Sequence, residues 1–526
     1  MSRSALTISH ILKVPVYMLG LILTTGAVLA ENADLRLPNA AMNRDVPAVL
    51  ALLEQGADPN VQGQYATPAL HWMVRVDEVE VVERLLKAGA NPNGVTGQGL
   101  SALSLAIENG SAATTTLLLD AGADANARLV TGETMLMSAA AVGEPEVVAT
   151  LLAHGAELGA RDRDFGQTAL MIAVREGHAK VVSQLITAGA DVNATTTIGP
   201  TPAFVAANSV PGFGFGIGII RGGVPKDRGR REPIPGGLTP LLYAARHGHV
   251  DIARQLLEAG AELNTPEANG IWPLLMAISN NQMPMAHFLL EQESVLINSE
   301  DWYGRSPIWE AVNVRNLYVN NATFLNGIDR APVLEIINEL IAKGADLNAR
   351  TRETPPFRHY LLEITGSLEW VDFTGQTPFL TAAMAGDVTV MKLLLEHGAD
   401  PLIGTFEGTS ALMAAAGVNW VVAQTWTESE ARLLEAVKLC LELGMDVNQT
   451  NSMGLTALMG AANRGSNEII SFLVSQGADL TAQDNEQRTA LDWARGVFLA
   501  THPAEQKPES MALISELLTS QGKEVR

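Results

Sequence analysis

Residues 236–264 read GGLTPLLYAARHGHVDIARQLLEAGAELN, and this order predicts two short helices joined by a tight turn. Thr239 is suited to cap the first helix, and Pro240 to fill its first position, where a backbone amide would have no partner. Gly248 ends this inner helix because a residue without Cβ adopts the left-handed conformation at little cost. Apolar residues at helical spacing then predict an outer helix over about 250–259.

Nearly the same segment recurs along most of the chain. The glycines of its Gly-Ala pairs are 33 or 34 residues apart in the first five copies, at Gly56, Gly89, Gly122, Gly155 and Gly189. Later counterparts are Gly260, Gly344, Gly398, Gly444, Gly477 and Gly522. Asn264 begins the turn that leads to the next copy, and Asn tolerates the backbone angles of turns well. A period of this length predicts a solenoid of stacked helix-turn-helix units, about twelve in number.

The repeated pattern T-P-L-x-x-A-A-x-x-G-H-x-x-x-A-x-x-L-L-x-x-G-A-x-x-N resembles an ankyrin repeat. It is also visible in GETMLMSAAAVGEPEVVATLLAHGAELGA (132–160), GQTALMIAVREGHAKVVSQLITAGADVNA (166–194) and GLTALMGAANRGSNEIISFLVSQGADLTA (454–482). The whole layout is similar to exported bacterial ankyrin proteins that carry insertions in their later repeats. The resemblance implies an all-α repeat fold, an ankyrin solenoid with β-turn or hairpin connections and long inserted loops.

The sequence departs from the ankyrin pattern at the position after Thr-Pro-Leu. That slot often holds a His that ties one repeat to the next. His71 keeps it, and Asp492 fills it near the C-terminal end. In six other repeats the slot is apolar, which predicts apolar contacts between repeats, at Met137, Met171, Leu242, Leu380, Met413 and Met459.

Residues 1–30 predict a secretory signal peptide. Arg3 and Lys13 precede an uncharged apolar run, and small residues up to Ala30 suit cleavage near that residue. A periplasmic or secreted protein is therefore expected, with an uncleaved membrane anchor as the alternative. Cys440 is the single cysteine of the chain, so no internal disulfide can form, and we expect this residue to be a small buried hydrophobe.

The repeat period is interrupted several times. Repeats occupy 31–208, and residues 209–236 form a Gly- and Pro-rich insertion before the repeats continue over 237–526. Shorter insertions are expected near 314–331, 351–372 and 418–430. We expect insertions at equivalent points of a solenoid to emerge on one side, where they could form a wall or lid.

Composition and motifs argue against several classes of function. The chain carries 57 acidic against 35 basic residues, a net charge of −22, so a nucleic-acid partner is not expected. The stretch GFGFGIG (212–218) does not open a helix, as a phosphate-binding loop must. The sequence lacks Gly-x-Ser-x-Gly, His-Glu-x-x-His and Cys-x-x-Cys. We therefore expect no enzymatic activity, no cofactor and no metal.

Two groups of residues are candidates for partner binding. Large aromatic side chains fall at turn tips and helix starts, where they could anchor a protein partner, at Trp272, Trp302, Tyr303, Trp309 and Phe373. Alternatively, they pack as a local core beneath the insertions. A basic group within the first insertion could grip a carboxylate or phosphate, or could lie against the acidic body of the protein, at Arg228, Arg230 and Arg231.

The function predicted from these features is protein recognition without catalysis. A rigid array would bind a protein partner in the bacterial cell envelope through its concave face and its insertions. One alternative is a membrane-associated scaffold held by the N-terminal segment or an apolar loop, although membrane contact is not favoured. A second alternative is a small-ligand or enzymatic pocket beneath the insertions.

Overall fold

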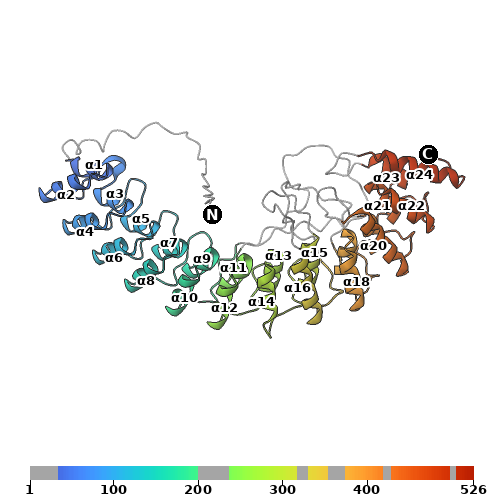
Figure 1. Ribbon diagram of the computed structural model, residues 1–526, viewed down its shortest axis with the longest axis horizontal. Helices are drawn as coiled ribbons and strands as arrows, with labels where there is room; N and C mark the ends of the chain where they lie inside the picture. The colour runs from blue at the N-terminus through green and yellow to red at the C-terminus, as the bar shows by residue number, and fades with distance from the viewer. Residues whose placement is uncertain are drawn as a thin grey trace. The chain divides into compact units, whose positions relative to one another are not determined.

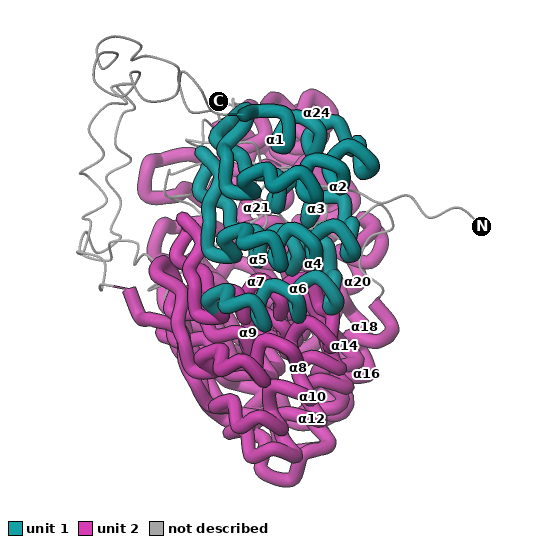
Figure 2. Tube along the Cα trace, turned by 90° about the vertical axis from the view of Figure 1, so that its left-hand side faces the viewer, with its two compact units in different colours: residues 1–124 teal, residues 125–526 magenta. Residues whose placement is uncertain are grey.

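The computed structural model describes residues 34–199, 236–316, 330–352, 374–418, 428–497 and 505–525. The chain divides into two compact units, residues 1–124 and 125–526, which Figure 2 shows in different colours. The predicted signal peptide and most of the predicted insertions lie outside the described residues.

The described residues form helix pairs throughout. Unit 1 contains α1 (Arg36–Met42), α2 (Val46–Glu54), the 3-10 turn η1 (Gln64–Ala66), α3 (Ala69–Arg75), α4 (Val79–Lys87), α5 (Ala102–Glu108) and α6 (Ala112–Asp120). In each pair the odd-numbered helix is the inner helix and the even-numbered helix the outer one.

Unit 2 continues the same alternation. Its first helices are α7 (Met135–Val142), α8 (Pro145–Ala153), α9 (Ala169–Glu176), α10 (Ala179–Thr187), α11 (Pro240–His247), α12 (Val250–Glu258), α13 (Pro273–Ser279), α14 (Met283–Leu290), α15 (Pro307–Arg315) and α16 (Arg330–Ala342). Its later helices are α17 (Pro378–Ala385), α18 (Val388–Glu396), α19 (Ala411–Ala416), α20 (Glu430–Glu442), α21 (Ala457–Arg464), α22 (Asn467–Ser475), α23 (Ala490–Gly496) and α24 (Pro508–Ser520). Within unit 2 the inner helices stack in one layer and the outer helices in another (Figure 1). Twelve helix pairs in the described ranges confirm the predicted repeat array.

The segment quoted at the outset folds as α11 and α12. Thr239 Oγ1 accepts a hydrogen bond from Leu242 N at 3.2 Å and so caps α11. Gly248 ends α11 with φ of 76°, and a Cβ there would lie 2.2 Å from Oε1 of Gln282. Glycine is therefore required both for the turn and for the approach of the next repeat.

The slot after Thr-Pro-Leu is buried and apolar, as predicted. The side chains are at most 1% exposed at Met137, Met171, Leu242, Leu380, Met413 and Met459. His71 instead places Nε2 3.0 Å from the carbonyl oxygen of Gly94, and burial lowers the pKa of His71. Asp492 turns back to its own helix start, where Oδ2 accepts from Thr489 N at 2.9 Å. Cys440 is buried, and burial raises the pKa of its thiol to about 12.

A side-chain amide bridges most consecutive repeats. Nδ2 of Asn264 donates to the carbonyl of Ser294 at 2.7 Å, and its Oδ1 accepts from Leu296 N at 3.2 Å. The same pair of bonds is formed with the next repeat at Asn60, Asn93, Asn126, Asn193, Asn298 and Asn448. The sequence predicted Asn264 only as a turn former, whereas its side-chain amide also forms hydrogen bonds with the next repeat. We call these residues the Asn clamp.

We expect Asn264→Ala to destabilise the array by about 1–2 kcal/mol, because two neutral hydrogen bonds between repeats are lost. Urea unfolding followed by circular dichroism measures this change. Thr481→Ala is the matched control, since Thr481 takes the same turn position and its hydroxyl bonds Asp479 in its own turn. Equal losses in the two variants would show that the clamp adds nothing beyond the turn.

Candidate protein-recognition surface

A hairpin turn precedes each inner helix from α3 onward, and we call each of these turns a finger. Neighbouring fingers of unit 2 are joined by backbone hydrogen bonds. Trp302 N donates to the carbonyl of Asn269 at 2.9 Å, and Phe406 N donates to that of Thr374 at 3.1 Å. These bonds join the backbones of neighbouring fingers directly, so they fix the position of one finger relative to the next.

Two insertions leave the array at finger tips. In an uninterrupted finger, Thr405 N donates to Thr409 O at 2.9 Å and Thr409 N donates to Thr405 Oγ1 at 3.0 Å, across four residues. The same two bonds close one finger across 42 residues, between Thr196 and Leu238, at 3.0 and 2.9 Å. They close another across 25 residues, between Thr351 and Gln376, at 3.1 and 3.0 Å. Each of these two fingers thus keeps both closing hydrogen bonds although it carries an insertion.

Two other insertions lie between an inner helix and its outer helix, after α15 and α19. Their flanking residues meet in a charged cluster around Asp387. Oδ2 of Asp387 accepts from Arg315 Nε and Arg330 Nη2, both at 2.8 Å, and Arg330 also pairs with Glu428. Arg330 Nη2 reaches Asn316 Oδ1 at 3.0 Å, so the two ends of residues 317–329 are linked. The expectation that the insertions share equivalent points is therefore wrong, because finger tips and helix turns are different places in the repeat.

Exposed apolar side chains lie on three consecutive fingers of unit 2. Val130, Phe165 and Ile198 are 76%, 65% and 59% exposed. Arg128 Nη1 links the first two of these fingers by donating to Arg161 O at 3.0 Å, and Thr197 N links the last two by donating to Phe165 O at 2.9 Å. We call Val130, Phe165 and Ile198 the apolar tips. Sequence reasoning missed them, although the Phe of RDRDFG is conspicuous in a polar turn.

A group of basic side chains lies at the ends of α9 and α11, and we call Arg175, Arg246, His247 and His249 the cationic edge. The rings of His247 and His249 are stacked with centroids 5.9 Å apart. His249 Nε2 is 3.4 Å from the carbonyl oxygen of Arg175, a residue 74 positions earlier in the chain. The sequence gives no direct sign of this cluster, because the first insertion separates its two halves.

The predicted aromatic anchors have different environments. Tyr303 and Trp309 are buried, with exposed fractions of 3% and 4%. Trp309 follows Ser-Pro-Ile and fills the slot that Met171 and Leu242 take in their repeats, so it packs between repeats. Trp272 is half-buried and its Nε1 donates to the carbonyl of Glu300 at 3.4 Å. Trp302, also half-buried, stacks on Tyr303 with centroids 6.5 Å apart.

The local-core alternative therefore describes Tyr303 and Trp309, whereas Trp272 and Trp302 keep part of their surface in solvent. The remaining predicted anchors lie outside the described residues, namely Phe373, Arg228, Arg230 and Arg231.

A buried ion group supports the fingers near these aromatics. Arg305 is 3% exposed, and its Nε donates to Asp301 Oδ2 at 2.7 Å while Nη1 lies 3.4 Å from Glu310 Oε1. Ser279 Oγ, at the end of α13, donates to the same Glu310 oxygen at 2.7 Å. Burial acts to lower the pKa of Arg305, but Glu310 and Asp301 outweigh it and raise that pKa. Burial raises the pKa of Asp301 although Arg305 opposes this change.

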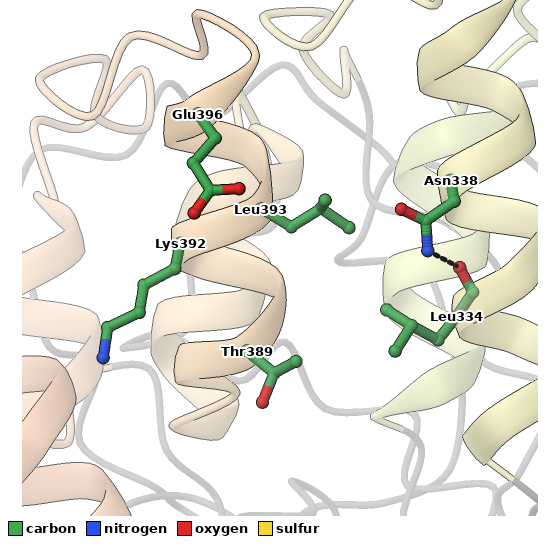
Figure 3. A pocket seen from close by; sticks show the side chains of 6 residues that line it. All are labelled: Leu334, Asn338, Thr389, Lys392, Leu393 and Glu396. Atoms are coloured by element: carbon green, nitrogen blue, oxygen red, sulfur yellow. Dashed lines mark hydrogen bonds between the residues drawn. The ribbon is translucent and has the colours of Figure 1, made fainter.

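An open groove of about 360 Å³ lies between the outer helices α16 and α18 (Figure 3). Leu334 and Leu393 project into it from the two sides. Asn338 Nδ2 donates to Leu334 O in its own helix at 2.8 Å, and the Thr389 hydroxyl accepts from Arg432 Nη2 at 3.0 Å. The groove thus offers an apolar strip and not the convergent polar groups of a small-ligand site.

Three histidines of the described ranges, His154, His178 and His397, have structural roles. His154 and His397 cap outer helices, with Nδ1 2.8 and 2.9 Å from the carbonyl oxygens of Thr150 and Leu393. His178 Nε2 lies 3.0 Å from Ala141 O in the preceding repeat. Among the described residues, no three His, Cys, Asp or Glu side chains are grouped so that they could hold a metal ion.

We expect Arg305→Met to lower the free energy of unfolding by about 3–5 kcal/mol, because two buried carboxylates lose their cation. The loss should shrink as the pH falls from 7 to 5, since burial raises the pKa of Asp301 and protonation then removes its uncompensated charge. Urea unfolding at several pH values measures both effects. The control is Arg352→Met, which removes an ion pair whose arginine is 65% exposed and should change stability little. A pH-independent loss would contradict this assignment.

Comparisons with known proteins place these features in a family. A family model described as ankyrin repeats (3 copies) matches residues 37–128, 115–196, 241–351 and 428–496, and an ankyrin repeat model matches 374–403. The Neurospora crassa ankyrin repeat protein nuc-2 is 34% identical over 169 residues, which are 32% of this chain and 15% of that protein. The Caenorhabditis elegans ankyrin repeat and KH domain-containing protein mask-1 is 30% identical over 256 residues, 46% of this chain and 8% of that protein.

Among solved structures, the human ASB11 ankyrin repeat domain is 24% identical, with a TM-score of 0.38, and the match covers 49% of this chain and 98% of that domain. The chain spans only a small part of the two curated relatives, so the likeness is to their repeats. Because the family models match well over half of its residues, which fold as helix pairs in both units, the chain belongs to the ankyrin repeat family.

Proposed function

We propose that this protein is a non-enzymatic scaffold of the bacterial cell envelope that binds a protein partner through the fingers and inner helices of unit 2, with its insertions adding specificity. The observation that carries the proposal is the row of apolar tips. Val130, Phe165 and Ile198 stay 59–76% exposed on fingers that hydrogen bonds hold together. Exposed apolar side chains on a rigid support are typical of binding surfaces, because little ordering entropy opposes association.

The insertions support the same function. Each of the two expanded fingers keeps the closing bonds of an ordinary finger, so its insertion starts and ends beside the neighbouring tips. Ile198, one of the apolar tips, lies within the finger that Thr196 and Leu238 close and that carries the first insertion. Binding loops on a rigid scaffold are a common arrangement for recognition.

The envelope location rests on residues 1–30. Their basic start, apolar run and small residues before Glu31 have the layout of a signal peptide. Among the described residues, no helix is both long and apolar enough to cross a membrane. Fractionation of cells that express the full chain tests the location, and recovery of the unprocessed chain in the cytoplasm would contradict it.

The tips are tested by crosslinking capture from the native envelope with Val130→Ser/Phe165→Ser/Ile198→Ser. We expect this variant to lose at least tenfold of the captured partner, because it removes an aromatic and two aliphatic side chains from the apolar core of the proposed interface. Leu402→Ser is the matched control, since Leu402 is 62% exposed but lies in the turn after α18, away from the finger tips. Equal capture by the triple variant and the wild type would refute the assignment.

The first insertion is tested separately by replacing residues 200–235 with a short Gly-Ser link. The array should remain folded and gain about 2 kcal/mol, because the bonds between Thr196 and Leu238 lie outside the deletion and a shorter loop loses less entropy. Thermal unfolding measures the stability. Loss of partner capture at unchanged or higher stability would assign recognition to the insertion, and unchanged capture would assign it to the repeat surface.

A further inference from the structure

The cationic edge interrupts the pattern of the inner helices. Arg175 and Arg246 occupy one equivalent position, in the last turns of α9 and α11. In the neighbouring inner helices α7 and α13 this position holds Ala141 and Ser279. A cation there is therefore not needed to complement the helix dipole, because α7 and α13 end without one.

Two histidines belong to the same cluster. The His249 ring lies against Gly177 of the preceding repeat, where a Cβ would be only 2.9 Å away from it. His247 stacks on that ring at 5.9 Å. The two repeats therefore bring four nitrogen-bearing side chains together on a protein whose net charge is −22.

The charges within the cluster are not all neutralised. Arg175 pairs with Glu176 at 2.8 Å, whereas Arg246 is exposed and forms no salt bridge with the described residues. Burial lowers the pKa of His247, and the charges of Arg246, His249 and Arg175 lower it further, while Glu176 acts in the opposite direction. The nearby positive charges and burial therefore disfavour the charged form of His247 in the free protein.

The cationic edge belongs to the face from which the fingers project. Arg175 Nη1 donates to Gln167 Oε1 at 3.1 Å, and Gln167 Nε2 donates to Tyr243 Oη at 2.5 Å. Gln167 ends the finger that carries Phe165, so a chain of hydrogen bonds runs from that finger across the inner helices to the edge.

We propose that the cationic edge binds carboxylates of an acidic segment of the protein partner, and that this binding strengthens as the pH falls. The inference rests on the function proposed above and adds the chemistry of the partner. Apolar side chains of the segment would meet Phe165 and Ile198, and its carboxylates would meet Arg246, His247 and His249. Arginine and protonated imidazole are suitable donors to carboxylates.

The direction of the pH dependence follows from linkage. A carboxylate bound beside His247 would raise the pKa of that imidazole, so binding takes up protons. Because the pKa of His247 is lowered in the free protein, affinity should rise as the pH falls through and below the ordinary histidine value of about 6.5. Each new solvent-exposed ion pair adds modestly, so we expect about three- to tenfold tighter binding at pH 5.5 than at pH 7.5.

The chain itself supplies the substitutions for the test. The residues of the α13 repeat that correspond to Arg246, His247 and His249 are Ser279, Asn280 and Gln282. The variant Arg246→Ser/His247→Asn/His249→Gln therefore copies a neighbouring repeat that folds without these charges. Lys343→Ser is the matched control, because it removes an exposed cation at the end of α16, on the outer layer.

The probe is a fluorescein-labelled peptide of alternating Glu and Leu, with Lys-Leu and Glu-Ser peptides of equal length as comparisons. Fluorescence anisotropy with the full chain at pH 7.5 and 5.5 gives the affinities. We expect the Glu-Leu peptide to bind most tightly, and the triple variant to lose both affinity and pH dependence while the control keeps them. Inorganic phosphate, added as competitor, should weaken binding only at concentrations far above the peptide concentration.

Equal binding of the Glu-Leu peptide by wild type and triple variant would overturn the proposal, as would preference for the Lys-Leu peptide. Competition by phosphate at concentrations comparable to the peptide would assign the edge to free anions instead. Envelope capture separates this inference from the proposed function. Capture lost with the apolar-tip variant but kept with the edge variant leaves the scaffold function intact and refutes the acidic partner.

Discussion

The packing of each inner helix against the next is the interaction on which this structure depends. A single repeat is too thin to bury its own apolar face, so Leu242 and Met171 become fully buried only because neighbouring repeats cover them. This requirement fixes which connections can vary. The turn from outer helix to finger carries the Asn clamp, so its length is constrained. The long insertions of unit 2 are found instead in the fingers and between an inner helix and its outer helix.

Much of the fold could be predicted because local chemistry repeats. Thr-Pro marks the start of an inner helix and Gly its end, and these signals return often enough to identify the helix pairs. For Asn264 only the role in the turn was predicted, because a turn preference is a local property of the sequence. Its hydrogen bond to the carbonyl of Ser294 joins two repeats and depends on the fold. The expectation that the insertions occupy equivalent points of the repeat failed for a similar reason. The sequence shows where periodicity stops, whereas the closing partner, such as Leu238 for Thr196, is defined only by the folded finger.

The binding surface was harder to predict than the fold. The sequence left Trp309 open between a partner anchor and a local core, and its buried position, in register with Met171 and Leu242, supports the core interpretation. The cationic edge escaped notice because Arg175 and His249 become neighbours only when the insertion between them is looped out. The net charge is a sum over the whole chain, so a strongly acidic value does not reveal a local cluster of basic side chains. Exposure of a side chain such as Val130 is likewise decided by its place on the finger and not by its residue type.

In two fingers of unit 2, hydrogen bonds of the array close the finger although an insertion interrupts it. Thr196 pairs with Leu238, and Thr351 with Gln376, by the bonds of an ordinary finger, so the ends of each insertion are held together by the array itself. Segments at these two sites can therefore lengthen, shorten or be exchanged during evolution without a compensating change in the repeats. The repeats and the insertions can therefore evolve independently of each other. The same two fingers are suitable positions for grafting foreign recognition loops.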